Sequence, residues 1–472
     1  MFDRRTTIVA TLGPASTEPK TLERLIRAGL DVARINLSHG THEEHRQRLR
    51  HVRTAAKRVG RTVGVLFDLQ GPKIRIGRLR GGHPVRLARG GRFAITTCPV
   101  AGDATRVSTT YRHLPGDVQR GDSILLDDGR LRLLVDRVTG DTVHTVVQHG
   151  GWLGEKKGMN LPGVALSAPA LTPKDYADLA FAIAEKADYL ALSFVRSRRD
   201  ILLLRRWLVA RQAAIPIIAK IERREALDHL EEILEAADGV MVARGDLGVE
   251  LSLARVPILQ KTIIAQANRA ARLVITATQM LESMIERPVP TRAEATDIAN
   301  AIFDQTDAVM LSGETASGHY PVEAVRTMST IIGEAEHSLF ARPVVPTMTL
   351  AGDHSVTQLI VEGAAHAARD PRIRAIVAFT MTGTTVRRLA KQRPAKPILA
   401  LTSNPKIAQR MALYWGVESF LARAGRTTET MIDLGLRVLR KAGRLRTGDQ
   451  VILIAGTVHH MGATNMMKLV TV

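Results

Sequence analysis

Short apolar runs recur along the chain, and stretches with a helical pattern separate them. Such runs are typical of buried parallel strands, whose interiors need no polar alternation. A helix is expected to begin at Thr172, because a threonine followed by a proline suits an N-cap and first turn. The eight strands predicted before residue 343 are Thr7–Thr11, Asp31–Ile35, Thr62–Phe67, Tyr189–Phe194, Ile215–Ile221, Gly239–Val242, Leu273–Ala277 and Ala308–Leu311.

The strand–helix rhythm is interrupted between residues 72 and 170. There Gly, Pro, Asp and Arg become more frequent, and Asp128-Gly129 and Gly140-Asp141 read as tight hairpin turns. We therefore predict a small antiparallel β domain inserted after the third strand, a small β-barrel that acts as a lid. Its exit, 150–158, combines glycines with Lys156 and Lys157, which suits a mobile lid that brings a cation to a phosphate. An exposed basic turn without a function is an equal alternative.

The two pieces that flank this insertion, 1–71 and 171–343, together have about the 250 residues of a (β/α)8 barrel. A break follows near Arg342–Pro346. The remainder, 344–472, alternates again, with strands expected at 373–380, 398–402, 451–455 and 467–472. The predicted fold is therefore α/β: a TIM barrel, the inserted β domain, and a C-terminal open α/β domain.

Charged residues follow two consecutive strands of the predicted barrel. Alternation along a strand places Lys220 and Glu222 on one face, and likewise Arg244 and Asp246. The carboxylates of Glu222 and Asp246 suit Mg²⁺ or Mn²⁺, and Lys220 beside them suits a phosphoryl group. Two structural ion pairs are the alternative. We favour a site, because every such motif lies at the carboxyl end of a strand, where these barrels hold their chemistry.

Two further segments could bind phosphate. Arg34, Asn36 and Ser38 face one side if the extended geometry continues, and together they suit a phosphate or cation shell. His39 could contact a nucleotide, although a lone histidine is more often structural. The segment Thr380–Thr385 lies between a strand and a helix, so its hydroxyls and amides could hold a phosphate; ordinary helix capping is the alternative.

Composition narrows the class of protein. With 472 residues and 45% apolar content, two or three well-filled domains are expected, with aliphatic cores because only 4% of residues are aromatic. The single cysteine, Cys98, excludes a disulfide within the chain. The N-terminus lacks the apolar core of a signal peptide, and no run is long enough to span a bilayer. We expect a cytoplasmic protein without a membrane partner.

The net charge of +20 raises the question of nucleic-acid binding. The basic residues are scattered, and no alternation of aromatic and basic residues marks a base-stacking surface. We therefore expect no nucleic-acid partner, and take the charge as a bias toward arginine that also attracts anionic small molecules.

Several segments, in this order, closely resemble the pyruvate kinase family over essentially the whole chain: Ala10–Ser16, Ala33–Gly40, Ile218–Glu222, Met241–Gly248, Ala277–Pro290, Thr291–Glu294 and Met310–Thr315. The resemblance implies transfer of the phosphoryl group of phosphoenolpyruvate to ADP, which gives pyruvate and ATP in the last step of glycolysis. It also implies an allosteric enzyme, usually a homotetramer.

The resemblance assigns roles to individual positions. By similarity, Glu222 and Asp246 bind the divalent ion, Lys220 stabilises the migrating phosphoryl group and Arg34 holds the phosphate. Positions that hold the substrate carboxylate match Gly245, Asp246 and Thr278. Positions that contact the nucleotide match Asn36, His39, Arg75 and Lys157. Candidates for the proton path to the enolate match Thr278, Ser312 and Glu314.

One departure concerns K⁺, which many members require. They hold it at positions matching Asn36, Ser38, Asp68 and the Leu69 carbonyl, and they carry Glu where this chain has Lys73. Lys73 therefore resembles the K⁺-independent branch, which implies that K⁺ is not required. A tethered ammonium can supply the charge that K⁺ brings, and it is already in place. A lysine without a function is the alternative.

The remaining implications concern regulation and the alternative functions of the chain. Phosphorylated effectors bind regulated members at a loop that matches Thr380, Thr382, Gly383, Thr384 and Thr385; which effector would bind does not follow. A metal-dependent, aldolase-like barrel enzyme acting on phosphoenolpyruvate or pyruvate is the main alternative, although it would need neither Lys157 nor Lys220. A binding protein without activity is disfavoured, because it would be free to lose Lys220, Glu222, Asp246 and Thr278, which are all present.

Overall fold

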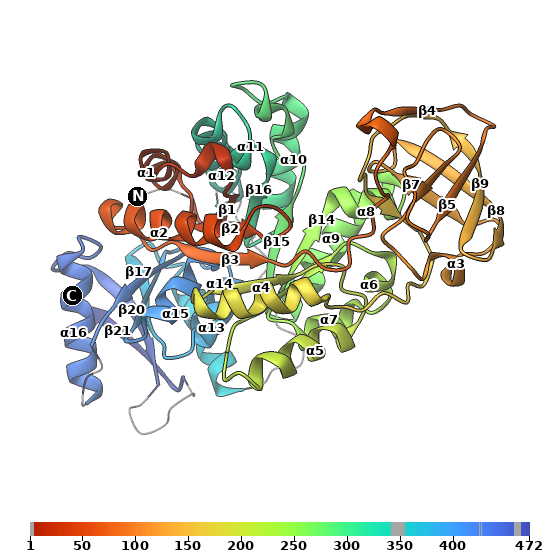
Figure 1. Cartoon of the computed structure of the whole chain (residues 1–472). Coiled ribbons are helices and arrows are strands. Elements are labelled where there is room, and N and C mark those ends of the chain that lie inside the picture. Colours follow the sequence, from red (N-terminus) through yellow and green to blue (C-terminus); the bar gives the residue numbers. More distant parts are fainter. Residues whose placement is uncertain (1–3, 341–354, 424, 426, 457–463) are drawn as a thin grey trace.

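Eight parallel strands close into a barrel in the order β1-β16-β15-β14-β13-β12-β3-β2 (Figure 1). The computed structural model describes residues 4–340, 355–423, 425, 427–456 and 464–472. All eight predicted barrel strands are confirmed. They are β1 (Thr7–Thr11), β2 (Val32–Asn36), β3 (Gly64–Asp68), β12 (Tyr189–Leu192), β13 (Ile217–Ile221), β14 (Gly239–Ala243), β15 (Leu273–Ala277) and β16 (Ala308–Leu311).

Helices surround the barrel and bury their apolar faces against it. As predicted, Thr172 caps one of them: its side chain accepts a hydrogen bond from the backbone N of Asp175, and Pro173 opens the first turn. The surrounding helices are α1 (Pro19–Ala28), α2 (His42–Val59), α4 (Pro173–Ala184), α5 (Arg198–Val209), α7 (Leu230–Ala236), α9 (Val256–Arg269), α10 (Arg292–Phe303) and α12 (Pro321–Phe340). Short helices α6 (Arg224–Asp228), α8 (Arg244–Glu250) and α11 (Gly313–Ala316) lie among them.

An aspartate precedes every second strand at the amino-terminal end of the barrel, a repeat that is not obvious in the sequence. Asp31, Asp188, Asp238 and Asp307 stand directly before β2, β12, β14 and β16. Each accepts a hydrogen bond of 2.8–2.9 Å from a backbone N of the neighbouring strand. The aspartates therefore pair the strands two by two at the end of the barrel opposite the predicted site.

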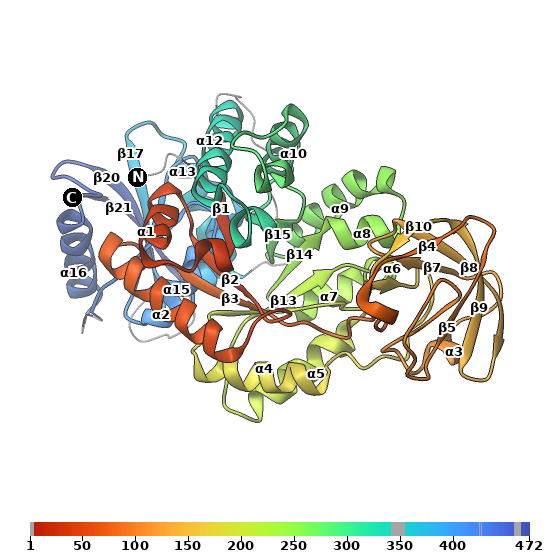
Figure 2. The same cartoon turned by 45° about the horizontal axis from the view of Figure 1, so that its top comes forward.

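The inserted domain follows β3 and projects from one end of the molecule, coloured orange in Figures 1 and 2. It contains a six-stranded sheet, β11-β7-β8-β9-β5-β6, and a two-stranded sheet, β10-β4, around a core of its own. The predicted turns join β7 to β8 and β8 to β9, whereas β5 and β6 pair in parallel. Its elements are β4 (Val85–Leu87), β5 (Arg92–Thr96), β6 (Arg106–Ser108), α3 (Leu114–Asp117), β7 (Ser123–Leu126), β8 (Leu131–Thr139), β9 (Thr142–His149), β10 (Gly151–Leu153) and β11 (Met159–Asn160).

The C-terminal domain, blue in Figure 1, holds a five-stranded sheet in the order β19-β18-β17-β20-β21. Its strands are β17 (Ile373–Phe379), β18 (Ile398–Thr402), β19 (Val417–Leu421), β20 (Gln450–Ala455) and β21 (Met466–Thr471). Its helices are α13 (Val356–Ala367), α14 (Thr384–Lys391), α15 (Pro405–Arg410) and α16 (Thr428–Lys441). The sequence analysis missed β19, an edge strand whose residues are only half-buried and include Glu418 and Ser419. The predicted break at 342–346 and the 343/344 boundary lie outside the described residues.

The barrel and the C-terminal domain share one apolar core. Val9, Leu66 and Ile218 from the barrel strands belong to the same buried cluster as Met411 and Trp415 from the C-terminal domain. The Tyr189 hydroxyl also donates a hydrogen bond of 2.7 Å to the carbonyl of Arg410. The two are therefore joined over the amino-terminal end of the barrel. Within the described residues, no helix has the length and apolar character needed to cross a membrane.

Candidate active site

Lys220 lies at the centre of a buried charge cluster at the carboxyl ends of β2, β3 and β13. Its Nζ atom is 2.8 Å from Oε1 of Glu222, 2.8 Å from Oγ of Ser193 and 3.4 Å from Oδ1 of Asp68. Arg34 completes the cluster, with Nη2 2.6 Å from Oδ2 of Asp68. Alternation along β13 brings Lys220 and Glu222 together as expected. The cluster also includes Ser193, which the sequence analysis did not single out.

The electrostatics of this cluster keep its groups charged. Burial disfavours the charge on Lys220, but Asp68 and Glu222 outweigh burial and raise the pKa of the ammonium. Burial also opposes ionisation of Asp68, yet Lys220 and Arg34 outweigh it and lower the pKa of that carboxyl. The cluster therefore presents two fixed cations, of which the Lys220 side chain is 12% exposed.

Asp246 reaches the site in a different way from the one predicted. The backbone leaves the strand after Ala243, and α8 begins at Arg244, so strand alternation does not apply to Arg244 and Asp246. The expectation that they face the same way is wrong. The Arg244 guanidinium is buried, with Nη1 2.6 Å from Oδ2 of Asp297 and Nη2 2.7 Å from the carbonyl of Thr278, so it holds the loop after β15.

Glu222, which is buried, and Asp246, which is half-buried, form a pair of acidic groups that suits a divalent cation. Burial, and next the nearby carboxylate of Glu222, raise the pKa of Asp246 to about 7, against the opposing effects of Lys220 and Lys73. A divalent ion between the two carboxyl groups would relieve this repulsion. The described residues contain no group of three or more acidic, His or Cys side chains placed to bind a metal. Two carboxylates fit Mg²⁺, which keeps several waters or substrate oxygens.

The loops after β15 and β16 carry the candidates for carboxylate binding and proton transfer. Thr278 has φ of +66°, which is unusual for a β-branched residue and is found where structure enforces it. Its Oγ1 accepts a hydrogen bond of 2.9 Å from the backbone N of Gly245, at the start of α8. Glu314 is fully buried and accepts from the backbone N of Leu281 (3.1 Å) and of Ser312 (2.6 Å). Glu314 therefore ties the two loops together.

The segment after β2 is surrounded by cations. The strand ends at Asn36, whose Oδ1 accepts from the backbone N of Ser38, so the extended geometry assumed for Ser38 does not continue. Burial, then Lys73, Arg75, Arg34 and Lys174, lower the pKa of His39.

Lys174 is a member of this group that the sequence analysis missed, because its place in the sequence indicates only the first turn of a helix. Its Nζ donates to the carbonyl of Leu37 and to Oδ2 of Asp178, each at 2.6 Å. The concentration of positive charge around His39 suits a polyphosphate.

The lid residues are not gathered at the Lys220 cluster. Lys157 Nζ lies 2.9 Å from Oδ1 of Asp127 within the inserted domain, and Arg75 donates to the carbonyl of Lys156. Lys73 is exposed and lines a cavity between the inserted domain and the barrel, together with Asp128, Arg196, Arg223 and Asp246. Among the described residues, Asp68 pairs with Arg34 and Lys220, not with Lys73.

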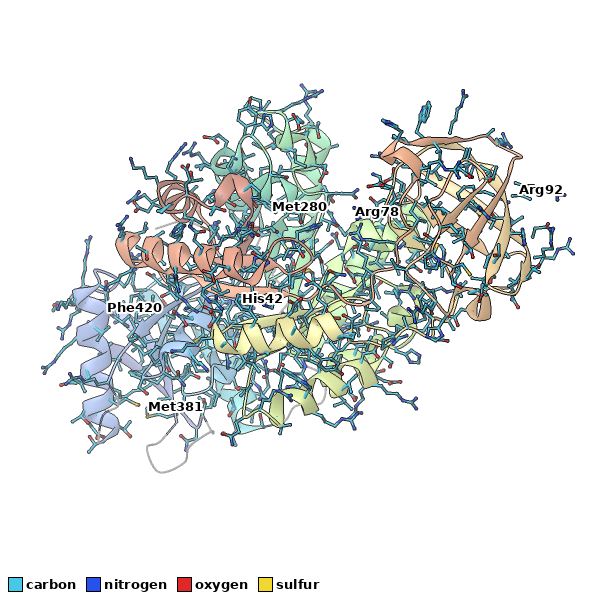
Figure 3. All side chains as sticks on the ribbon, viewed as in Figure 1. His42, Arg78, Arg92, Met280, Met381 and Phe420 are labelled. Carbon is cyan, nitrogen blue, oxygen red and sulfur yellow. The ribbon has the colours of Figure 1, made fainter. Side chains whose placement is uncertain are left out.

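The Thr380–Thr385 loop belongs to the C-terminal domain and lies between β17 and α14. Figure 3 labels Met381 of this loop on the C-terminal domain, away from Arg78 and Arg92 of the inserted domain. Thr380 Oγ1 accepts from the backbone N of Gly383, and Thr385 bonds with Thr464, so both hydroxyls are already used. Thr382 and Thr384 are exposed, and among the residues that the structure describes they bond to each other and within the loop alone. Hydrogen bonds therefore use the hydroxyls of Thr380 and Thr385, whereas those of Thr382 and Thr384 face solvent.

Comparisons with known proteins agree along the whole chain. Residues 3–325 match the family model described as "Pyruvate kinase, barrel domain", and residues 358–470 match "Pyruvate kinase, alpha/beta domain". A pyruvate kinase of Geobacillus stearothermophilus is 47% identical over 99% of this chain and 80% of its own length. One of Staphylococcus epidermidis is 44% identical over the same shares. A crystal structure of a pyruvate kinase from Cryptosporidium parvum is 37% identical, with a TM-score of 0.91 over 99% of this chain and 96% of that one.

Proposed function

The chain belongs to the pyruvate kinase family, and from this premise we propose which of its residues carry the reaction. The activity is transfer of the phosphoryl group of phosphoenolpyruvate to ADP, giving pyruvate and ATP, the last step of glycolysis. The family match decides between this phosphotransferase and the aldolase-like alternative. The observation that best supports the residue assignment is the 2.8 Å contact between Lys220 and Glu222, buried beside Asp246.

Lys220 and Arg34 stabilise the migrating phosphoryl group. The transition state of such a transfer spreads negative charge over the phosphoryl oxygens, so fixed cations oppose the charge where it develops. Both side chains are held by Asp68, which leaves neither free to follow the substrate by a change of rotamer. The cluster is thus organised before substrate binds, and little reorganisation is required during transfer.

Glu222 and Asp246 hold the divalent ion, Mg²⁺ or Mn²⁺, and the nearby backbone at Gly245 with Thr278 holds the substrate carboxylate. A divalent ion there supplies charge neutralisation for the substrate's phosphoryl and enolate oxygens. Thr278 and Ser312 guide the proton to the enolate carbon, and Glu314 positions both loops. This assignment is supported by the hydrogen bond that Thr278 accepts from the backbone N of Gly245 in α8, and by those that Glu314 accepts from the backbone of both loops.

The nucleotide lies beside Asn36, His39, Arg75 and the lid residue Lys157. The positive charge around His39 supports this placement. Lys157 approaches the nucleotide when the inserted domain closes over the barrel.

Lys73 supplies the monovalent positive charge that K⁺ brings to other members, near Asn36, Ser38, Asp68 and the Leu69 carbonyl. Its position beside Asp246, on which it exerts an electrostatic effect, supports a role at the site.

The domain limits are 1–71 with 171–343 for the catalytic barrel, 72–170 for the lid and 344–472 for an effector and assembly domain. The protein acts in the cytoplasm as a homotetramer, without membrane or nucleic-acid partners.

A phosphorylated effector binds the loop of Thr380, Thr382, Gly383, Thr384 and Thr385. The exposed hydroxyls of Thr382 and Thr384 support this last assignment.

The experiment that tests the reaction is pyruvate formation from phosphoenolpyruvate, ADP and Mg²⁺ in K⁺-free buffer, followed by K⁺ titration. We expect full activity without K⁺, and K⁺ activation in Lys73→Met but not in the control Lys156→Met, an exposed lysine of the lid. Activity of the wild type that appears only with K⁺ would keep the kinase and refute the role of Lys73. Absence of pyruvate under all conditions would refute the function.

A further inference from the structure

Two chain segments join the inserted domain to the barrel, one after β3 and one before α4, and both are bound by the same carboxylate. Asp175, in the first turn of α4, accepts a hydrogen bond of 3.0 Å from the backbone N of Gly71 through Oδ1. Its Oδ2 accepts from the backbone N (2.8 Å) and from the hydroxyl (2.6 Å) of Thr172. Asp175 therefore ties together the two points at which the chain leaves the barrel and returns to it.

The surroundings of Asp175 make these hydrogen bonds costly to lose. The residue is fully buried, and its two oxygens share three donors from the two connections. The first turn of a helix also favours a carboxylate, because unpaired N–H groups give it a partial positive charge. A buried carboxylate that loses a donor bears the cost of desolvation without compensation. We therefore expect these bonds to persist while the chain beyond them moves.

On the other side of these two points, the chain is bound to the inserted domain instead. The carbonyl of Ile74 accepts a hydrogen bond of 2.9 Å from the backbone of β11. Ser167 donates to Asp117 through its backbone N at 2.9 Å and through its hydroxyl at 2.7 Å. Two short segments, 72–73 and 168–171, thus lie between the anchors on the barrel and those on the inserted domain. A rotation of the inserted domain bends the chain in these segments.

The first connection also packs against the Lys220 cluster. Gly71 has φ of +65°, and a Cβ atom on it would lie 3.1 Å from both Ser193 Cβ and Phe194 Cδ2, so glycine is required there. Ser193 accepts a hydrogen bond from Lys220, and the backbone N of Phe194 donates to Glu222. The point where the chain leaves the barrel is therefore fixed relative to the proposed catalytic lysine and metal ligand.

The same turn of α4 holds the segment after β2. Lys174, next to Asp175, donates from Nζ to the carbonyl of Leu37 at 2.6 Å. Leu37 lies between Asn36 and His39, which we propose to contact the nucleotide. One helical turn thus fixes the attachment of the inserted domain relative to the proposed nucleotide site.

We propose that Asp175 is a positioning residue for phosphoryl transfer: it is the fixed pivot about which the inserted domain turns, and it sets how closely Lys157 approaches the nucleotide. This inference rests on the proposed function, in which the inserted domain closes over the barrel. Asp175 acts through Gly71 and Thr172. A displacement of about 1 Å at a reacting group can cost about a hundredfold in rate, so the place of the pivot matters.

The position of the inserted domain can be measured directly between two spin labels. Cys98, the single cysteine, is exposed on the inserted domain, and Lys57→Cys places a second thiol at an exposed position on α2. Pulsed dipolar spectroscopy gives the distribution of distances between the labels, with and without Mg-ADP. We expect Asp175→Asn to make this distribution about twofold broader, because the amide keeps one acceptor oxygen and releases one connection.

Kinetics on the unlabelled protein should follow the same pattern. Asp175→Asn should raise KM for ADP about tenfold and change KM for phosphoenolpyruvate less than about twofold. Thr172→Ala is the matched control: it removes the cap of the same helix but leaves the bonds from the backbone N of Gly71 and of residue 172. The control should unfold at a lower temperature, with an unchanged distance distribution and KM for ADP.

The outcomes separate the pivot from other roles. An unchanged distance distribution in Asp175→Asn, or equal broadening in Thr172→Ala, would overturn the proposal. Absence of pyruvate formation by the wild type would refute the proposed function, whereas the distance measurement would still decide whether Asp175 is the pivot.

A measurement on the wild type does not depend on the folding of any variant. The backbone amides of Gly71 and Thr172 should exchange slowly with deuterium, and equally with and without Mg-ADP, because their bonds to Asp175 persist when the inserted domain moves. Exchange in 168–171 should change on binding. Fast exchange at Gly71 would show that this bond opens with the inserted domain, and would overturn the pivot.

Discussion

Lys220 and Glu222, two residues apart on β13 and just beyond its end, hold each other at 2.8 Å in a site that is almost closed to solvent. Glu222 is fixed from the other side as well, because its Oε2 accepts from the backbone N of Phe194 at 2.7 Å. A cation and a proposed metal ligand therefore share one rigid support. Because both side chains are held in place, a substitution of either one can be tested separately for its effect on substrate binding and for its effect on turnover.

Replacing Lys220 by Met should reduce turnover far more than it weakens binding of phosphoenolpyruvate. Two unit charges about 4 Å apart interact by about 4 kcal/mol at an effective dielectric constant of 20, which corresponds to about a thousandfold in rate. Steady-state kinetics should show kcat lowered by about that factor, with KM changed less than about tenfold. Lys57→Met, at an exposed position on α2, is the control. A raised KM with an unchanged kcat would refute this role for Lys220.

Thr278 should require its hydroxyl group more than its methyl group. The hydroxyl accepts from the backbone N of Gly245, so Thr278→Ala leaves that donor without its partner at the proposed substrate carboxylate site. We expect kcat/KM to fall about thirtyfold in Thr278→Ala and less than about fivefold in Thr278→Ser. Both variants lose the β-branch at the positive φ, so strain is changed alike. Equal losses in the two variants would assign the effect to the backbone instead.

The contact between Lys157 and Asp127 predicts how the lid acts. Lys157 Nζ lies 2.9 Å from Oδ1 of Asp127, with the lysine side chain 43% exposed. Such an exposed ion pair contributes at most about 1 kcal/mol to stability. Lys157 can therefore leave Asp127 and bind a phosphate group without a large cost in free energy. Lys157→Met should raise KM for ADP about tenfold. Lys156→Met, the neighbouring exposed lysine, should change it little; a similar rise in both would show that only the net charge of the lid matters.

The sequence predicted the barrel because buried parallel strands produce continuous apolar runs, whereas β19 was missed because an edge strand does not. Strand alternation placed Lys220 beside Glu222 correctly. The same rule failed at Arg244 and Asp246, because the start of α8 depends on packing that the sequence pattern does not reveal. Lys174 shows a further limit: its contribution to the charge around His39 arises only when α4 is folded against the loop after β2.

Asp188 differs from the three other aspartates at the amino-terminal end of the barrel. Its Oδ2 accepts from the backbone N of Val65, but its Oδ1 is buried and has no hydrogen-bond partner in the described part of the chain, whereas Asp238 pairs with Arg205. Burial raises the pKa of Asp188 to about 6, although Arg410 and other cations oppose the shift. Because the folded-state pKa is higher than the unfolded one, the protonated carboxyl stabilises the fold. That stabilisation is complete below about pH 4 and is lost as the pH rises through about 6.

Asp188→Asn should therefore stabilise the protein near neutral pH. The amide keeps an oxygen acceptor for Val65 and removes the buried charge, which is worth up to about 3 kcal/mol for a shift from 3.8 to about 6. Unfolding temperatures measured from about pH 4.5 to 8 should show the variant above the wild type at the upper end, with the gap closing toward the lower end. Asp238→Asn is the control and should gain nothing at high pH, because it loses an ion pair with Arg205. A gap that does not vary with pH, or that appears equally in both variants, would mean that the charge of Asp188 is compensated in the folded protein.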